Sequence, residues 1–340
     1  MRVVSLIDEA SELDAEQELR DANRRLQIQL ARAKAKTEDL VDAVYRATRD
    51  SLTAGPLVTT PAPRKDSRKR KEEVALWHLT DWQGGKRTTS YDSTVMAKRI
   101  GVFLDKAEAI TRIQREDHPV KSCTVLFGGD MVEGLFNFPT QAFEIDATIF
   151  TQWQNVTRTL ITVVRRALAV YEDVTVVSEW GNHGRIGSKR DAVPASDNID
   201  RMCYETARMA LEHEGRLRWQ DSPEDIQRVE IGDYRALLLH GDETGRNGFV
   251  SQTTFLTYIN KLKAGAFGWD FQDVYSGHYH THDERAMADG RGAWYQTGST
   301  ESDNRYAMNG LGSRAEPSQR LHFVDPVKAR VTAQYKVWLD

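Results

Sequence analysis

Apolar residues are spaced in two different ways along this chain. In the first part, from about residue 13 to residue 49, they recur at helical spacing, as at Leu19, Leu26, Ala33 and Leu40, and no Gly or Pro interrupts them. From residue 74 onward, short runs of β-branched and aromatic residues alternate with helix-forming stretches. We therefore predict a long N-terminal helix over residues 1–50 and an α/β domain over residues 74–340.

The N-terminal helix has two open interpretations. A second partial apolar stripe through Leu30 and Val44 favours a coiled coil, which would pair the chain with a second copy or with a partner protein. Asn23 and Thr37 interrupt that stripe, which favours a single amphipathic helix that packs on its own domain. Between the helix and the domain, residues 51–73 combine Pro with a basic cluster and predict a flexible linker, which either binds nucleic acid or serves only as a solvated tether.

The domain is predicted to contain strands that alternate with helices and then mostly strands. The predicted strands are VALWHLTD, CTVLFGGD, VTVVSEWGNH, YRALLLHGD, DVYSGHYH, GAWYQTGS, RLHFVD and ARVTAQYKVW. The predicted helices run over about 94–114, 147–171, 198–213 and 251–263. This order is typical of an α/β or α+β domain.

Composition places the protein in the cytoplasm. Its 340 residues, 40% of them hydrophobic, suffice for one sizeable core, and no apolar run approaches the roughly 20 residues that span a bilayer. The two cysteines, Cys123 and Cys203, lie far apart in apparent core segments, and no secretory leader opens the chain. The net charge of -4 gives no overall attraction to nucleic acid, so any such attraction must be local.

Five short segments carry side chains that bind metal ions: TDWQGG, GGDMVEG, WGNHGR, LLLHGD and SGHYHTH. Each follows a predicted strand, where α/β sheets gather functional side chains. Carboxylate, amide and imidazole groups together suit a two-metal hydrolytic site. The candidate ligands are Asp81, Gln83, Asp130, Asn182, His240, His278 and His280, and His183 adds an imidazole beside them.

In this order the motifs DxQ, GGD, GNHG, HGD and GHxH resemble the signature blocks of the calcineurin-like metallophosphoesterases, over about residues 76–340. The longer strings SDNID and QTGSTESDNRYAMNG are most similar to phosphoesterases of bacteriophages and to the branch of the double-strand-break repair nuclease. The resemblance implies a two-sheet β-sandwich flanked by helices, with a dimetal centre at one edge. For a phage-encoded protein, the compartment would be the host cytoplasm.

The resemblance also implies a role for each residue of the centre. Asp130 would bridge both ions, and His183 would donate a proton to the leaving oxygen. The first ion would be held by Asp81, Gln83 and His280, and the second by Asn182, His240 and His278. More loosely, Arg185, Lys86 and Arg87 lie in the same turns and are predicted to bind substrate phosphate.

One position departs from the family pattern. Gln83 stands where the family usually has histidine, and its carbonyl oxygen is a harder, weaker donor than an imidazole nitrogen. We therefore expect two divalent ions, Mn²⁺ or Mg²⁺ in preference to Zn²⁺, with Fe²⁺ as a further alternative. In the other interpretation, Gln83 contacts no metal and hydrogen-bonds a bound water.

Three functions remain open at this point. The first is a metal-dependent phosphodiesterase, a nuclease, that acts on nucleic acid; Phe136 and Phe138 in the loop GLFNFPTQ would then be the best candidates to stack on bases. The second is a phosphatase or phosphodiesterase that acts on a small molecule or a phosphoprotein. The third is a noncatalytic scaffold that retains the fold.

Overall fold

The computed structural model describes residues 59–69, 71–135, 141–186, 197–220, 224–243, 251–303 and 316–340. The chain divides into two compact units, residues 1–56 and 57–340. The predicted N-terminal helix and the predicted stacking residues Phe136 and Phe138 lie outside the described residues, so these predictions stay predictions.

The larger sheet has six strands in the order β11-β10-β1-β2-β3-β4. Its parallel strands are β1 (Glu73–Leu79), β2 (Val120–Gly128), β3 (Asp173–Glu179) and β4 (Leu217–Gln220). Antiparallel β10 (Ser318–Asp325) pairs with β1, and β11 (Arg330–Trp338) pairs with β10. The carboxyl ends of four parallel strands therefore meet at one edge of this sheet.

The smaller sheet has five strands in the order β5-β6-β7-β9-β8. It consists of β5 (Gln227–Ile231), β6 (Tyr234–Leu238), β7 (Asp273–Ser276), β8 (Asp283–Ala286) and β9 (Ala293–Gln296). Its three central strands β6, β7 and β9 are parallel, while β5 and β8 are antiparallel to their neighbours.

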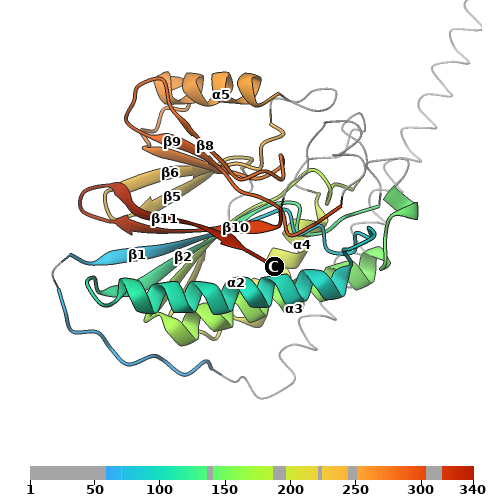
Figure 1. The fold of residues 1–340 in the computed structure, drawn as a ribbon, viewed down its shortest axis with the longest axis horizontal. Helices are drawn as coiled ribbons and strands as arrows, with labels where there is room; N and C mark the ends of the chain where they lie inside the picture. Colours follow the sequence, from blue (N-terminus) through green and yellow to red (C-terminus); the bar gives the residue numbers. More distant parts are fainter. Residues whose placement is uncertain are drawn as a thin grey trace, which may run out of the picture. The chain divides into compact units, whose positions relative to one another are not determined.

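Helices cover the outer faces of the two sheets (Figure 1). On the outer face of the larger sheet, α2 (Ser93–Gln114) and α3 (Ile149–Val170) lie side by side, and α4 (Ile199–Ala210) packs on α3. On the smaller sheet lies α5 (Gln252–Lys261), which continues into a π turn, η2 (Leu262–Ala266). One 3₁₀ turn, η1 (Gln141–Phe143), precedes α3. Within the described residues no helix has the length and apolarity that crossing a membrane requires.

Four side chains begin the long helices at the predicted places. Asp92, Thr148, Asn198 and Ser251 each accept a hydrogen bond from a backbone N–H of the first turn. Such N-caps satisfy donors that have no partner within the helix, and each contributes about 1 kcal/mol. The helix starts therefore agree with the predicted ones to within a few residues.

The core lies between the two sheets and continues under α5. Leu76, Leu126 and Val177 from the larger sheet pack against Tyr234 and Tyr275 from the smaller one. A second cluster joins the outer face of the smaller sheet to α5. The predicted two-sheet sandwich flanked by helices is therefore confirmed in the described residues.

The C-terminal half of the predicted linker is held against the domain. Thr60 donates from both its N–H and its hydroxyl to Glu214, each at 2.7 Å, and the Asp66 N–H donates to Glu172 at 2.8 Å. Arg68 of the basic cluster pairs with Asp66 at 2.8 Å. Residues 59–69 have neither helix nor strand, but these contacts give them a defined path, while the flexibility of the whole segment stays a prediction.

Candidate metal centre

The seven predicted ligands lie in loops that follow parallel strands. The loops after β1, β2 and β3 come from the larger sheet, and those after β6 and β7 come from the smaller one. Five of the eight described non-glycine residues with positive φ are candidate ligands: Asp81, Gln83, Asp130, His278 and His280. This left-handed conformation costs about 1–3 kcal/mol per residue and clusters at functional sites, so the turns are built to direct these side chains inward.

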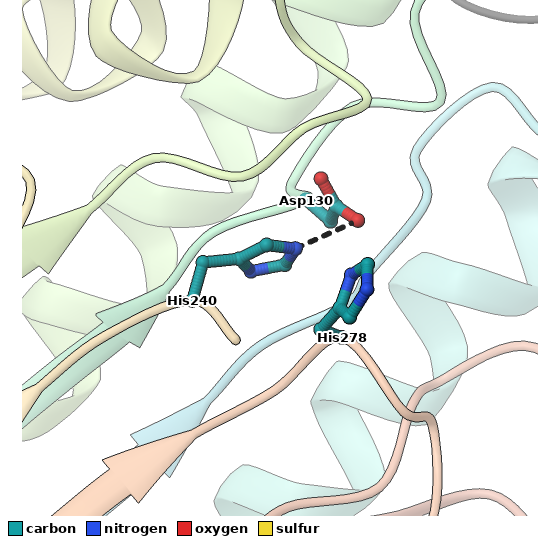
Figure 2. A group of neighbouring side chains, drawn as sticks. All are labelled: Asp130, His240 and His278. Atoms are coloured by element: carbon teal, nitrogen blue, oxygen red, sulfur yellow. Dashed lines mark ion pairs between the residues drawn. The ribbon is translucent and has the colours of Figure 1, made fainter. Parts of the chain in front are cut away.

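One group of metal-binding atoms consists of Asp130, His240 and His278, whose ligand atoms lie within 4.8 Å of one another (Figure 2). His240 Nε2 lies 3.1 Å from Asp130 Oδ2 and 3.2 Å from Asn182 Oδ1. The rings of His240 and His278 meet edge to face, with centroids 5.2 Å apart. This group matches the predicted second site.

The other group consists of Asp81, Asp130 and His280. His280 Nε2 lies 3.2 Å from Asp81 Oδ1, and both Asp81 and Asp130 are buried. Asp130 belongs to both groups, which is the position expected of a bridging carboxylate, because its two oxygens can reach two ions about 3.5–4 Å apart.

Gln83 lies beside the group of Asp81, Asp130 and His280. Its Nε2 atom is 3.3 Å from Asp130 Oδ2 and 3.5 Å from His280 Nε2, while its Oε1 atom is buried and has no hydrogen-bond partner among the described residues. The oxygen and nitrogen of an amide are assigned from their surroundings, and a flip would turn Oε1 toward Asp130 and His280. A buried orphan oxygen beside two ligands fits a metal ion, which would satisfy it.

Two imidazoles are oriented by hydrogen bonds at their far nitrogens. His240 Nδ1 lies 2.8 Å from the Gly128 carbonyl oxygen, and His280 Nδ1 lies 2.6 Å from Glu301 Oε1. Each contact places the proton on Nδ1 and leaves Nε2 directed at the centre, as metal-binding histidines require. Glu301 follows β9 and belongs to the string QTGSTESDNRYAMNG, but its contact with His280 was not predicted from the sequence.

Burial and opposite charges shift the pKa values of the centre in opposite directions. Burial raises the pKa of Asp130, but the imidazoles of His240 and His183 outweigh it and hold that pKa well below its usual range. Burial lowers the pKa of His280, but Glu301 and Asp81 outweigh it and raise the pKa to about 10. Burial and the nearby His240 lower the pKa of His278 to about 4.

His183 lies beside the bridging aspartate. Its backbone N–H donates to Asp130 Oδ1 at 2.8 Å, and its Nε2 atom lies 3.9 Å from Asp130 Oδ2. On its other side, Nδ1 lies 3.1 Å from the Glu133 carbonyl oxygen and 3.2 Å from Glu133 Oε2. Glu133 therefore holds Nδ1, while Nε2 lies on the side of Asp130. The sequence showed Glu133 only as part of GGDMVEG.

Asp200 ties two of the ligand loops together. Its Oδ1 atom accepts from the Val132 N–H and its Oδ2 atom from the Gly181 N–H, both at 3.0 Å. Asn198, two residues earlier, donates to the Gly181 carbonyl oxygen at 2.8 Å. These two residues of SDNID position the loops that carry Asp130 and Asn182, which gives this string a structural role that its residue types alone did not reveal.

The three predicted phosphate-binding residues have different surroundings. Arg185 pairs with Asp242 at 2.9 Å, and Arg87 is exposed. Lys86 is buried, with its Nζ atom 3.5 Å from Glu133 Oε1 and 3.7 Å from Glu301 Oε2. Both neighbouring carboxylates thus contact the charge of Lys86, and its predicted contact with phosphate stays a prediction.

The remaining aromatic and histidine candidates lie mostly in the core. Trp82, Tyr91 and Trp180 are buried, as expected for packing residues. His78 and His322 are fully buried. His282 is partly buried and belongs to neither of the two metal-binding groups found among the described residues.

No protein-family model matches the chain, and no curated protein matches it. Among solved structures, it is similar to Vps29 from Entamoeba histolytica in complex with zinc, at 13% identity and a TM-score of 0.33 over 78% of this chain and 99% of that one. A predicted phosphoesterase from Streptococcus pneumoniae matches at 12% identity and a TM-score of 0.30 over 78% and 98%. The sulfate thiohydrolase SoxB from Thermus thermophilus matches at 10% identity and a TM-score of 0.36, over 81% of this chain and 58% of that one. At these values the function has to be argued from the site itself.

Proposed function

We propose that this protein is a calcineurin-like metallophosphoesterase that hydrolyses phosphodiesters of nucleic acid with two divalent ions. The observation that carries the proposal is Asp130, whose carboxylate belongs to both metal-binding groups. Two ions that share one carboxylate are the usual arrangement of two-metal phosphoester hydrolysis. Gln83 in place of a histidine favours Mn²⁺, with Mg²⁺, Fe²⁺ and Zn²⁺ as alternatives.

The residues of the centre have different roles in the proposed hydrolysis. Two bound ions would supply hydroxide at neutral pH and neutralise charge on the phosphoryl oxygens. Asp81 and Asp130 would hold the ions with negatively charged oxygens, and the neutral imidazoles and amides would hold them without neutralising the charge of the ions. His183, with Nδ1 held by Glu133, has Nε2 available to donate a proton to the leaving oxygen. No protein nucleophile is needed.

An exposed aromatic side chain in the segment that contacts His183 supports a nucleic-acid substrate. Phe143 is 88% exposed in η1, two residues after Gln141, whose Nε2 lies 3.4 Å from His183 Nδ1. The next residue, Glu144, accepts at its carbonyl oxygen from the N–H of the exposed Arg87, at 2.7 Å. An aromatic ring and a guanidinium group on paired segments at the site suit a base and its flanking phosphate, and stacking contributes about 1–3 kcal/mol per base.

The residues that tie the loops together support the narrower affinity with phage phosphoesterases and the repair-nuclease branch. Asn198 and Asp200 of SDNID hold Gly181 in the loop GNHG. A string that positions a metal-binding loop is constrained by the function of that loop. We therefore include this affinity, and the host cytoplasm as the compartment, in the proposal.

The reaction is tested by Mn²⁺-dependent hydrolysis of single- and double-stranded DNA, RNA, bis-p-nitrophenyl phosphate and p-nitrophenyl phosphate. Asp130→Asn is the control, because it removes the bridging charge and should abolish hydrolysis and reduce bound metal. Cleavage of polymer and diester that the variant lacks supports the nuclease. Turnover of the monoester alone would replace it by a phosphatase, and no turnover with Mn²⁺, Mg²⁺, Zn²⁺ or Fe²⁺ would favour the scaffold.

The substrate class is tested by replacing Phe143. Phe143→Ala should weaken binding of a short single-stranded DNA about 5- to 100-fold, as loss of one stacked base predicts, and should reduce quenching of a 2-aminopurine placed at successive positions. Ile113→Ala is the matched control: Ile113 is 68% exposed and lies near the far end of α2, about 30 Å along that helix from Ser93. Equal binding by both variants would remove Phe143 from the substrate site.

A further inference from the structure

Lys86 is buried between two glutamates that each contact a histidine of the candidate centre. Only 6% of Lys86 is exposed, and its Nζ atom lies 3.5 Å from Glu133 Oε1 and 3.7 Å from Glu301 Oε2. The other oxygen of Glu133 lies 3.2 Å from His183 Nδ1, and the other oxygen of Glu301 lies 2.6 Å from His280 Nδ1. Each carboxylate thus contacts the lysine with one oxygen and a histidine with the other.

The lysine is carried by a segment with a fixed backbone. The Lys86 N–H donates to the Gln83 carbonyl oxygen at 2.9 Å, and Lys86 forms an isolated β-bridge with Ile145. Beside that bridge, the Asp146 N–H donates to the Gly85 carbonyl oxygen at 2.9 Å. Lys86 therefore belongs to the same loop as Asp81 and Gln83, and the segment from 141 to 146 covers it.

Charge explains why a lysine is needed at this place. Glu133 and Glu301 are both buried beside Asp81 and Asp130, and buried carboxylates without a counter-ion are costly. Burial lowers the pKa of Lys86, but Glu133 and Glu301 outweigh it and raise that pKa above its ordinary value. A charged ammonium that contacts both carboxylates compensates their negative charge and fixes them in position, which an uncharged side chain cannot do.

We propose that Lys86 is a positioning residue shared by the leaving-group acid and the first metal site. Through Glu133 it fixes the ring of His183, and through Glu301 it fixes the ring of His280. Both histidines thereby keep Nε2 directed at the reacting groups. This proposal rests on the proposed function for the role of His183, but its metal-binding half stands on the contact between Glu301 and His280.

Four variants separate the role of Lys86 at His183 from its role at His280. Glu133→Gln should lower turnover of diesters with a poor leaving group at least tenfold more than turnover of p-nitrophenyl diesters, with Mn²⁺ affinity unchanged, because the only histidine that Glu133 contacts among the described residues is His183 and Lys86 keeps its contact with Glu301. Glu301→Gln should weaken the first Mn²⁺ site about 10- to 100-fold and leave the leaving-group dependence unchanged at saturating Mn²⁺. Lys86→Met, which keeps the length but not the charge, should show both defects, and Lys86→Arg should restore part of each.

Lys121→Met is the matched control for the loss of a paired lysine. Lys121 pairs with Glu72 at 2.8 Å at the start of β2, about 25 Å along that strand from the loop that carries Asp130. It should change neither Mn²⁺ affinity nor leaving-group dependence. Thermal unfolding of each variant identifies any that fails to fold. If Lys86→Met does not fold, Lys86→Arg is compared with the wild-type protein in its place.

The outcomes distinguish this proposal from the proposed function. If Lys86→Met shows neither defect, or one only, the shared role is overturned, and a rise in KM alone would return Lys86 to phosphate binding. If the wild-type protein hydrolyses no ester, the proposed function fails, but Mn²⁺ titration and ¹⁵N-imidazole spectra of the Mg²⁺-loaded protein still report on both rings. Lys86→Met should then shift the ring signals of His183 and His280 together, and unchanged signals would overturn the proposal.

Discussion

Asp130 Oδ2 and His240 Nε2 approach each other to 3.1 Å, and the opposite nitrogen of the same imidazole is held by the Gly128 carbonyl oxygen. His240 Nε2 therefore faces the Asp130 carboxylate, and a positive charge is needed to hold the two groups this close together. A metal ion can supply that charge, or a proton on the imidazole can. The competition between metal and proton determines how the centre responds to pH.

Metal binding should release protons. In the metal-free protein, Glu301 and Asp81 raise the pKa of His280 to about 10 against the effect of burial, and Asp130 likewise raises that of His240. His280 is therefore protonated at pH 7 and must lose a proton to bind an ion, and the raised pKa of His240 acts in the same direction, so Mn²⁺ affinity should rise as pH increases from 6 toward 9. Calorimetric titration in buffers of different ionisation enthalpy should give at least about one released proton at pH 7. A pH-independent affinity without proton release would contradict the ligand assignment.

His183→Ala should retain its metals and lose turnover. Its side chain lies 3.9 Å from Asp130 through Nε2 but belongs to neither metal-binding group. Loss of a general acid costs about 10²- to 10⁴-fold in rate, and the loss should be largest for a poor leaving group. Metal content by elemental analysis and kcat for alkyl and p-nitrophenyl diesters check both parts. Normal rates on an alkyl ester would exclude His183 from proton transfer.

The ligand loops were predictable because each follows a strand and carries an unusual residue type at its end. Asp81, Asp130 and His240 all come within two residues of a strand terminus, and parallel strands bring such termini together. The helix starts were predictable for a local reason as well, since Asp92 and Ser251 are good N-caps.

The network behind the ligands was not predictable from the sequence. A lysine after two glycines reads as an exposed phosphate-binding residue, yet Lys86 is covered by the segment that forms a bridge at Ile145. Its partners Glu133 and Glu301 lie 47 and 215 residues away, so only the tertiary fold brings the three together. The local sequence pattern predicts whether a side chain faces the core or the solvent. It does not predict which charged residue from a distant part of the sequence contacts that side chain.

Gln83→His should tighten the first site and shift its metal preference. An imidazole nitrogen is a softer and stronger donor to Zn²⁺ than an amide oxygen, and position 83 lies within 3.5 Å of both Asp130 and His280. The ratio of Zn²⁺ to Mn²⁺ affinity should rise at least tenfold, measured by competition titration with a chromophoric chelator. If Gln83 contacts only a bound water, the ratio should remain that of the wild-type protein.

Gly277→Ala should disrupt the first metal site by steric contact alone. A Cβ at Gly277 would lie 2.1 Å from Asp81 Oδ2 and 2.2 Å from Thr80 Oγ1, closer than any real contact, so the Asp81 carboxylate has to move. Because Asp81 also accepts from the His278 N–H at 3.0 Å, the loop with both histidine ligands should shift with it. We expect Mn²⁺ affinity to fall at least tenfold.

Gly101→Ala is the control, since a Cβ there meets nothing within 4 Å and alanine stabilises the interior of α2. Metal titration and thermal unfolding of both variants check the prediction, and equal Mn²⁺ affinity in the two would show that Asp81 is not held against Gly277 as the structure has it.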